Sequence, residues 1–180
     1  HCISSAASDV YKRQMLDFPN GTVITPDGKN LIIGETLGAR LTCFDIDSEG
    51  MLSNRRIWAK TSSQFGISLV QFLRNIGIKI SESGSTAKNF HVPDGICLDE
   101  QKGIWIASPT SSAVIRFEEG GTITDVIETP KNAYACMLGG RNGRTLFILT
   151  ANSSAPEICR KKPEGEIFSI EVNYPRAGMP

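Results

Sequence analysis

The chain lacks an excess of either charge, a long apolar run and a recognisable signal peptide. Its 180 residues carry 19 Lys and Arg against 19 Asp and Glu, so the formal net charge at pH 7 is zero. Such a balance gives no electrostatic footprint for nucleic acid and no polybasic membrane patch. The strongly apolar runs are about five residues long, whereas a transmembrane helix needs about 20. We therefore expect neither nucleic acid nor a membrane as a partner.

Cysteine pairs at metal-ligand spacing are also absent. The five cysteines are odd in number and widely spaced, without a Cys-x-x-Cys pair, which disfavours a zinc site or a thioredoxin-like motif. Cys43, Cys97 and Cys136 lie in apolar stretches and are predicted to be buried, reduced thiols. Reduced thiols together with the missing export signal favour a cytoplasmic location.

The first 14 residues, HCISSAASDVYKRQ, have no clear period and join abruptly to Met15. They resemble read-through from a sequencing adaptor, and an ordinary frayed N-terminus is the alternative. We treat residues 1–14 as a non-native tail and residues 15–180 as the domain. On that interpretation, native sequence upstream of Met15 is missing.

Three segments of the domain repeat one pattern of short strand, tight polar turn and second apolar strand. They begin at Phe18, Val92 and Ala133, and their second strands read LIIG, IWIA and LFIL. Third strands are expected at residues 40–46, 113–117 and 166–170, and fourth strands near residues 56–59 and 122–128. Four-stranded antiparallel units recurring at about 40–45 residues are typical of β-propeller blades.

We therefore predict an all-β fold with about three propeller blades, and a β-sandwich is the alternative. A sandwich does not explain why Asn20, Asp94 and Tyr134 recur at equivalent places in the three openings. Three blades cannot close a ring, because propellers need roughly four to eight. The open arc would leave an unpaired strand edge, which supports the interpretation of residues 15–180 as a partial propeller.

Residues 60–91 interrupt the repeat, and part of this insertion has a helical period. Apolar residues fall on one helical face at Phe65, Leu69, Phe72, Leu73 and Ile76. A short helix is therefore predicted near residues 62–77. The insertion ends just before Asp94, so we expect it to overhang that residue, either as a substrate lid or as decoration on the rim.

Two loop motifs offer hard oxygen donors. Asn20 lies in Pro-Asn-Gly and Asp94 in Pro-Asp-Gly, each at the mouth of an innermost strand, so the two side chains could converge. An amide carbonyl and a carboxylate suit Ca²⁺ or Mg²⁺. The alternative is turn chemistry, because Asn-Gly and Asp-Gly are good turn dipeptides anywhere.

Other polar residues are weaker candidates. Only one histidine, His91, lies outside the tail, and no Gly-x-Ser-x-Gly occurs, so a Ser-His-Asp hydrolase is disfavoured. The Gly-rich residues 139–143 lack the Lys-Ser/Thr of a P-loop and fit a turn. Trp58 and Trp105 are predicted to be core residues. Glu35 is expected to face solvent on an outer strand.

With these motifs in view, the chain resembles the senescence-marker-protein/gluconolactonase/luciferin-regenerating-enzyme family, also called regucalcin-like, and in particular the C-terminal part of a bacterial member. The matching stretches are PNGTVITPDGKNLIIGET, RLTCFDIDSEGMLSNRRIWA, PDGICLDEQKGIWIA and ACMLGGRNGRTLFILTA. They cover most of residues 18–151, and the closing VNYPRAGMP also looks like a bacterial branch.

The resemblance implies a six-bladed propeller with one divalent cation in its channel, Ca²⁺ first and Zn²⁺, Mg²⁺ or Mn²⁺ otherwise. It implies three ligands: a first-blade Glu, which would lie upstream of this chain, and the residues matched by Asn20 and Asp94. It also implies hydrolysis of aldonolactones such as gluconolactone, with Asp94 as the candidate general base. No substrate-binding residue is assigned.

A non-catalytic propeller that binds Ca²⁺ or a partner is the competing class, since one fold hosts both roles. Without the upstream Glu, the chain as given is expected to be incomplete and inactive. The sequence makes no prediction of its oligomeric state.

Overall fold

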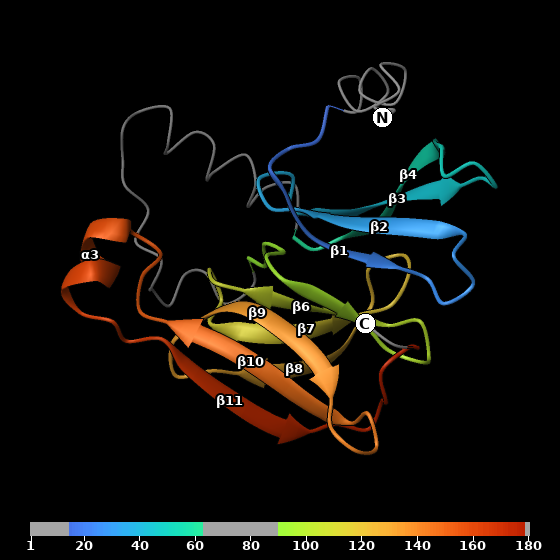
Figure 1. Cartoon of the computed structure of the whole chain (residues 1–180). Coiled ribbons are helices and arrows are strands. Elements are labelled where there is room, and N and C mark those ends of the chain that lie inside the picture. Colours follow the sequence, from blue (N-terminus) through green and yellow to red (C-terminus); the bar gives the residue numbers. More distant parts are fainter. Residues whose placement is uncertain (1–14, 63–89, 179–180) are drawn as a thin grey trace, which may run out of the picture.

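The computed structural model describes residues 15–62 and 90–178, which form three antiparallel sheets and one short helix (Figure 1). The first sheet contains β1 (Pro19–Ile24), β2 (Asn30–Glu35), β3 (Arg40–Ile46) and β4 (Leu52–Lys60). The second contains β5 (Ile96–Leu98), β6 (Ile104–Ser108), β7 (Ala113–Phe117) and β8 (Ile123–Glu128). The third contains β9 (Asn132–Gly139), β10 (Thr145–Ala151) and β11 (Glu166–Glu171), with helix α3 (Pro156–Lys161) between β10 and β11.

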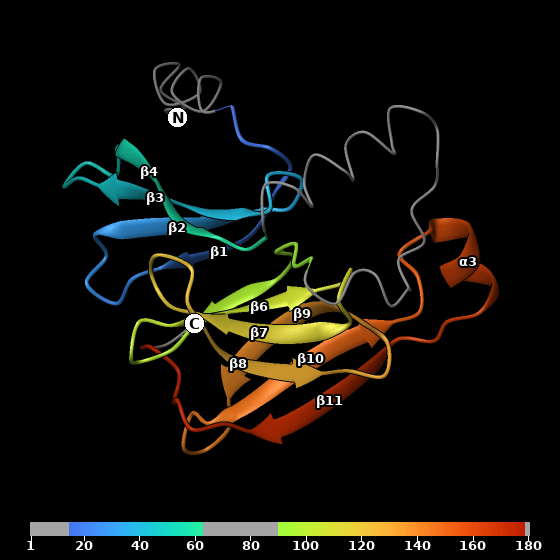
Figure 2. The same ribbon diagram turned by 180° about the vertical axis from the view of Figure 1, so that it is seen from behind.

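Each predicted repeat unit corresponds to one sheet whose spatial strand order follows the chain order. The prediction of a nearly all-β chain is therefore confirmed, and the described strands form three sheets instead of the two of a sandwich. The second sheet lies between the first and the third in both views of the molecule (Figure 1 and Figure 2). Among the described residues, no helix has the length and apolar character needed to cross a membrane. Residues 1–14 and the predicted helix near 62–77, from residue 63 onward, lie outside the described residues.

Tight turns set the strand register within each sheet. Between β1 and β2, the Asp27 carboxylate accepts hydrogen bonds from Thr25 Oγ1 at 2.6 Å and from the Lys29 N–H at 3.1 Å. Gly28 in this turn has a φ of +70°, a left-handed conformation that glycine adopts without a Cβ penalty. This chemistry fixes the hairpin, so the hydrophobic side of each strand faces a neighbouring sheet.

The register makes positions in the three sheets equivalent. Ile32 pairs with Val23 and Cys43, Trp105 with Cys97 and Arg116, and Phe147 with Met137 and Ser169. Ile32, Trp105 and Phe147 each lie on the second strand of their sheet, and their two partners lie on the first and third strands. The repeat seen in the sequence is thus also a repeat of cross-strand neighbours.

Two apolar cores lie between successive sheets. The core between the first and second sheets includes Trp58, 6% exposed, and the core between the second and third includes Trp105, 1% exposed. Both tryptophans are core residues, as predicted. Cys43, Cys97 and Cys136 are buried free thiols, also as predicted.

A buried ion pair within the second sheet is covered by the C-terminal segment, residues 173–178. Arg116 Nε donates to the Asp99 carboxylate at 2.6 Å, and both side chains are at most 1% exposed. The Tyr174 ring covers the guanidinium, with the Arg116 carbon 3.7 Å from the ring centroid. Backbone hydrogen bonds from Glu100 to Pro175 and from Ala177 to Leu98 hold the segment against β5.

Candidate functional site

Asn20 and Asp94 meet where the first strands of two sheets begin. Asn20 is the second residue of β1, and Asp94 precedes β5 by two residues. The Gly21 N–H donates to the Asp94 carbonyl at 2.9 Å, and β1 contacts β5 just as β5 contacts β9. The Asn20 side chain hydrogen-bonds the Asp94 carboxylate. The two residues that the repeat places at equivalent positions are therefore direct neighbours.

The glycines of Pro-Asn-Gly and Pro-Asp-Gly permit this close approach. A Cβ on Gly21 would lie 2.5 Å from the Asp94 carbonyl oxygen, and a Cβ on Gly95 would lie 2.7 Å from the Ala135 Cα. Both distances are shorter than any real Cβ contact. The two glycines thus serve strand-to-strand packing and not the turn chemistry that is the alternative interpretation of these dipeptides.

Burial controls the electrostatics of Asp94. Desolvation raises the pKa of the carboxyl group, and the hydrogen bond from Asn20 lowers it only in part, so the pKa stays above its ordinary value. Within the described part of the chain, no Lys or Arg forms an ion pair with this carboxylate. The carboxylate is therefore partly desolvated and lacks a positive neighbour.

Hydroxyl groups from both neighbouring sheets fix the segment that leads to Asp94. Thr36 Oγ1 donates to the Pro93 carbonyl at 2.7 Å, and the Val92 N–H donates to Ser108 Oγ at 3.2 Å. The His91 ring is buried, with Nδ1 3.0 Å from Ser111 Oγ. Burial lowers the pKa of His91, which favours the neutral ring and a positioning role in this loop.

Tyr134, the third equivalent position, supplies no carboxylate. Its carbonyl accepts the Gly95 N–H at 2.9 Å, which continues the backbone contact between first strands. Its hydroxyl lies 3.5 Å from Asn132 Nδ2. Among residues 15–62 and 90–178, no cluster of three or more His, Cys, Asp or Glu side chains is arranged to hold a metal ion.

The expectation that Glu35 faces solvent is wrong. Its side chain is 0% exposed and pairs with Arg40 Nη2 at 2.7 Å. Burial alone would raise the pKa of Glu35, but hydrogen bonds from Arg40, the Asp17 N–H and Thr42 lower it to about 2. Because Glu35 is the cross-strand partner of Pro19, this ion pair also anchors the start of β1. The opposite charges of Glu35 and Arg40 across a four-residue turn are the sequence signal that could have revealed the pair.

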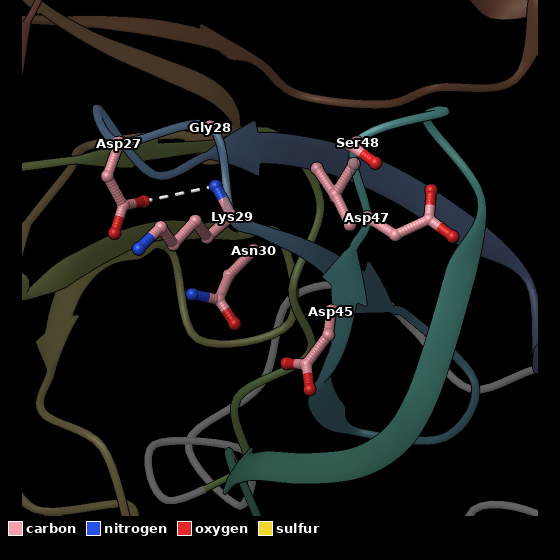
Figure 3. Close-up of a pocket in the computed structure, with 8 residues that line it drawn as sticks. Asp27, Gly28, Lys29, Asn30, Asp45, Asp47 and Ser48 are labelled. Atoms are coloured by element: carbon pink, nitrogen blue, oxygen red, sulfur yellow. Dashed lines mark hydrogen bonds between the residues drawn. The ribbon is translucent and has the colours of Figure 1, made fainter.

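A hollow at the opposite end of the first sheet gathers acidic residues without forming a cation site (Figure 3). The Asp27 carboxylate accepts the hydrogen bonds of its own turn that are described above. Asp47 Oδ1 accepts two N–H groups of the next turn, from Glu49 and Met51, at 2.9 and 2.8 Å. Asp45 pairs with Arg56 at 2.6 Å. Each of these three carboxylates therefore already has hydrogen-bond or ion-pair partners in its own turn or strand pair.

Comparison with known proteins gives a consistent family. The family model described as the SMP-30/Gluconolactonase/LRE-like region matches residues 3–152. Regucalcin from Sus scrofa is 26% identical over 160 residues, covering 86% of this chain and 45% of the relative. The chain therefore spans about half the length of the curated relatives it matches.

Two solved structures resemble the fold. A calcium-binding protein, regucalcin, from Agrobacterium tumefaciens has a TM-score of 0.59 at 19% identity, covering 89% of this chain and 47% of that one. A gluconolactonase from Xanthomonas campestris has a TM-score of 0.52 at 26% identity, covering 76% of this chain and 36% of that one. Since the family model accounts for most of the chain and the sheets match these structures, the chain belongs to the SMP-30/gluconolactonase/LRE-like family.

Proposed function

We propose that the three sheets are blades of a six-bladed propeller and that the Asn20–Asp94 end holds one divalent cation for the hydrolysis of sugar lactones. The observation that carries this is the Asp94 carboxylate, which is desolvated, hydrogen-bonded by the Asn20 side chain and without a basic partner among the described residues. A partly buried carboxylate needs compensation by a cation or by protonation. The relatives support the class, since one is a calcium-binding protein and another a gluconolactonase.

The residues present fit a hard cation. The Asn20 carbonyl oxygen and the Asp94 carboxylate are the donor types that Ca²⁺ selects, and Zn²⁺, Mg²⁺ or Mn²⁺ are the alternatives. When bound, such an ion would polarise the carbonyl of a lactone as a Lewis acid. Asn20 orients the carboxylate through its amide and adds no charge.

Asp94 is also the proposed general base. It would take a proton from the attacking water, and a bound cation would favour the ionised form of the carboxylate that accepts this proton. The hydroxyl-fixed segment before it, with Thr36 on Pro93, keeps the carboxylate in place. No residue is assigned to substrate binding.

Calorimetric titration with Ca²⁺ tests the cation site directly. Asp94→Ala should abolish the binding heat, and Asn20→Ala should weaken the affinity. Asp27→Ala is the matched control, because this carboxylate lies in a turn at the other end of β1 and its loss should change nothing. Equal affinity in the wild type and in Asp94→Ala would refute the site.

The competing function is Ca²⁺ binding without catalysis. It is supported by the relative from Agrobacterium tumefaciens, which is described as a calcium-binding protein, and it uses the same two donors, Asn20 and Asp94. A pH-stat assay with gluconolactone separates the two functions. Ca²⁺ binding that depends on Asp94 without lactone hydrolysis, in the chain and in a longer protein that contains it, would select the non-catalytic function.

A further inference from the structure

A β-bulge recurs at the beginning of the first strand in each of the three sheets. In β1, Asn20 and the residue after it lie opposite a single residue of β2. Before β5, the Asp94 N–H donates to the Ala107 carbonyl at 3.0 Å and the Ala107 N–H donates to the Gly95 carbonyl at 2.9 Å, so two residues share one partner. In β9, Tyr134 is the extra residue between two successive pairs with β10. A bulge interrupts the alternation of a strand and re-aims the side chain that it carries, so the three strands present this position in the same way.

One backbone contact links the three bulges in a row. The Gly21 N–H donates to the Asp94 carbonyl, and the Gly95 N–H donates to the Tyr134 carbonyl, both at 2.9 Å. The step from Asn20 to Asp94 is therefore repeated from Asp94 to Tyr134. Since the Asn20 side chain hydrogen-bonds the Asp94 carboxylate, the Tyr134 side chain begins next to the same residue on its other side.

Asn132 holds the phenol of Tyr134. Its Nδ2 donates to the phenol oxygen at 3.5 Å, and its Oδ1 accepts a hydrogen bond from Ser112 Oγ of the second sheet at 3.0 Å. The Asn132 side chain is buried, so its amide has a fixed position. Because Asn132 is the first residue of β9, the phenol leans towards the end of the sheets at which Asp94 lies. An amide N–H only donates, so the phenol oxygen is the acceptor in this contact and its O–H is the donor towards other groups.

We propose that Tyr134 binds the substrate, with its phenol donating a hydrogen bond to a ring hydroxyl group of a sugar lactone whose carbonyl lies at the Asn20–Asp94 pair. This rests on the proposed lactone hydrolysis and assigns a residue to its substrate. Ca²⁺ selects carboxylate, amide and carbonyl oxygens, so a tyrosine at the third position of the row serves a different ligand. A sugar ring has C–H faces and a hydroxyl edge, which match the apolar ring and polar tip of a tyrosine. A site that hydrogen-bonds a substrate hydroxyl discriminates against analogues without it.

Ligand-observed NMR titration with the calcium-loaded protein tests this contact. The probe is δ-gluconolactam, whose amide resists hydrolysis and whose ring keeps its hydroxyl groups, and δ-valerolactam is the matched probe without hydroxyl groups. Tyr134→Phe removes only the phenol oxygen, so it should raise the Kd for δ-gluconolactam about 3–10-fold and leave the Kd for δ-valerolactam unchanged. Tyr174→Phe makes the same chemical change in the ring that covers Arg116 and should change neither Kd. Circular dichroism checks that each variant stays folded.

Calcium titration separates this proposal from the function on which it rests. Tyr134→Phe should bind calcium like the wild type, whereas Asp94→Ala should not bind it. Calcium binding that depends on Asp94, together with equal δ-gluconolactam affinity in the wild type and Tyr134→Phe or with no lactam binding in either, would overturn the role of Tyr134 alone. A loss of calcium affinity in Tyr134→Phe would assign the tyrosine to the ion and also overturn it. Unchanged calcium affinity in Asp94→Ala would remove the cation site and this proposal with it.

Discussion

Replacing Gly21 by alanine tests whether the close contact of β1 and β5 positions the Asn20–Asp94 pair. The new Cβ would lie 2.5 Å from the Asp94 carbonyl oxygen and 2.6 Å from the Ile96 nitrogen. Ordinary van der Waals contact begins at 3.4 Å, so the two strands must separate by about 1 Å to accommodate it. The hydrogen bond from the Gly21 N–H to Asp94 would then be strained or lost.

The free-energy cost follows from these two effects. Overpacking a tight contact costs about 1–3 kcal/mol, and the lost backbone hydrogen bond adds about 1 kcal/mol. A total of about 2–4 kcal/mol corresponds to a fall in Tm of roughly 4–16 °C for a chain of this size. Displacement of the pair by about 1 Å should also reduce lactone hydrolysis in the catalytically competent protein by about 100-fold.

Urea unfolding at one fixed protein concentration measures the change in stability, and calcium titration measures the change at the site. Gly165→Ala is the matched control, because its Cβ would meet no atom closer than 3.9 Å, and its effect should stay within about 0.5 kcal/mol. If Gly21→Ala matched this control in stability and bound calcium like the wild type, the strand contact would not position the pair.

Three other perturbations follow from the buried charges and thiols. Arg116→Met leaves a fully buried carboxylate unpaired and should cost about 3–5 kcal/mol in urea unfolding, whereas Arg56→Met removes a more exposed pair and should cost under about 1 kcal/mol. The pKa of Glu35 is about 2 in the fold against an ordinary 4.5, so its contribution is present above pH 4.5 and is lost as the pH falls towards 2. Wild-type stability should drop by up to about 3 kcal/mol across that window, and Glu35→Gln should lack this drop. Ellman's reagent should label the exposed Cys159 in the native protein. Cys136 should react only after unfolding, because the hydrogen bond with the Cys97 thiol and burial raise its pKa.

The sheets could be predicted from the sequence because their information is local. Each sheet is a meander in which a strand pairs with the next one along the chain, so alternation and turn residues suffice to find it. The repeat also places Asn20 and Asp94 at equivalent positions, and the structure brings them into hydrogen-bond contact. Their role as cation ligands stays a prediction.

Long-range partners explain what the sequence did not reveal. Burial of Glu35 depends on the Asp17 N–H, 18 residues earlier, and on Arg55, 20 residues later. Burial of Arg116 depends on Asp99 and on a tyrosine from the C-terminal segment. No strand period encodes such partners, because each pair forms only after separate elements have packed. The need for glycine at position 21 could not be predicted for the same reason. The backbone of the segment at Asp94 and Ile96, which leaves no room for a Cβ at this position, lies far away in the sequence.

The C-terminal segment, residues 173–178, has a consequence for the order in which the protein folds during synthesis. The first sheet holds all its strand pairings within residues 19–60, so it can form while the ribosome is still translating the rest. The second sheet cannot reach its final packing that early, because Tyr174, which covers Arg116, is made 58 residues after it. At about 5–20 residues per second, that wait lasts about 3–12 s. Over this interval the Asp99–Arg116 pair remains open to water, and a segment made much later completes the middle of the molecule.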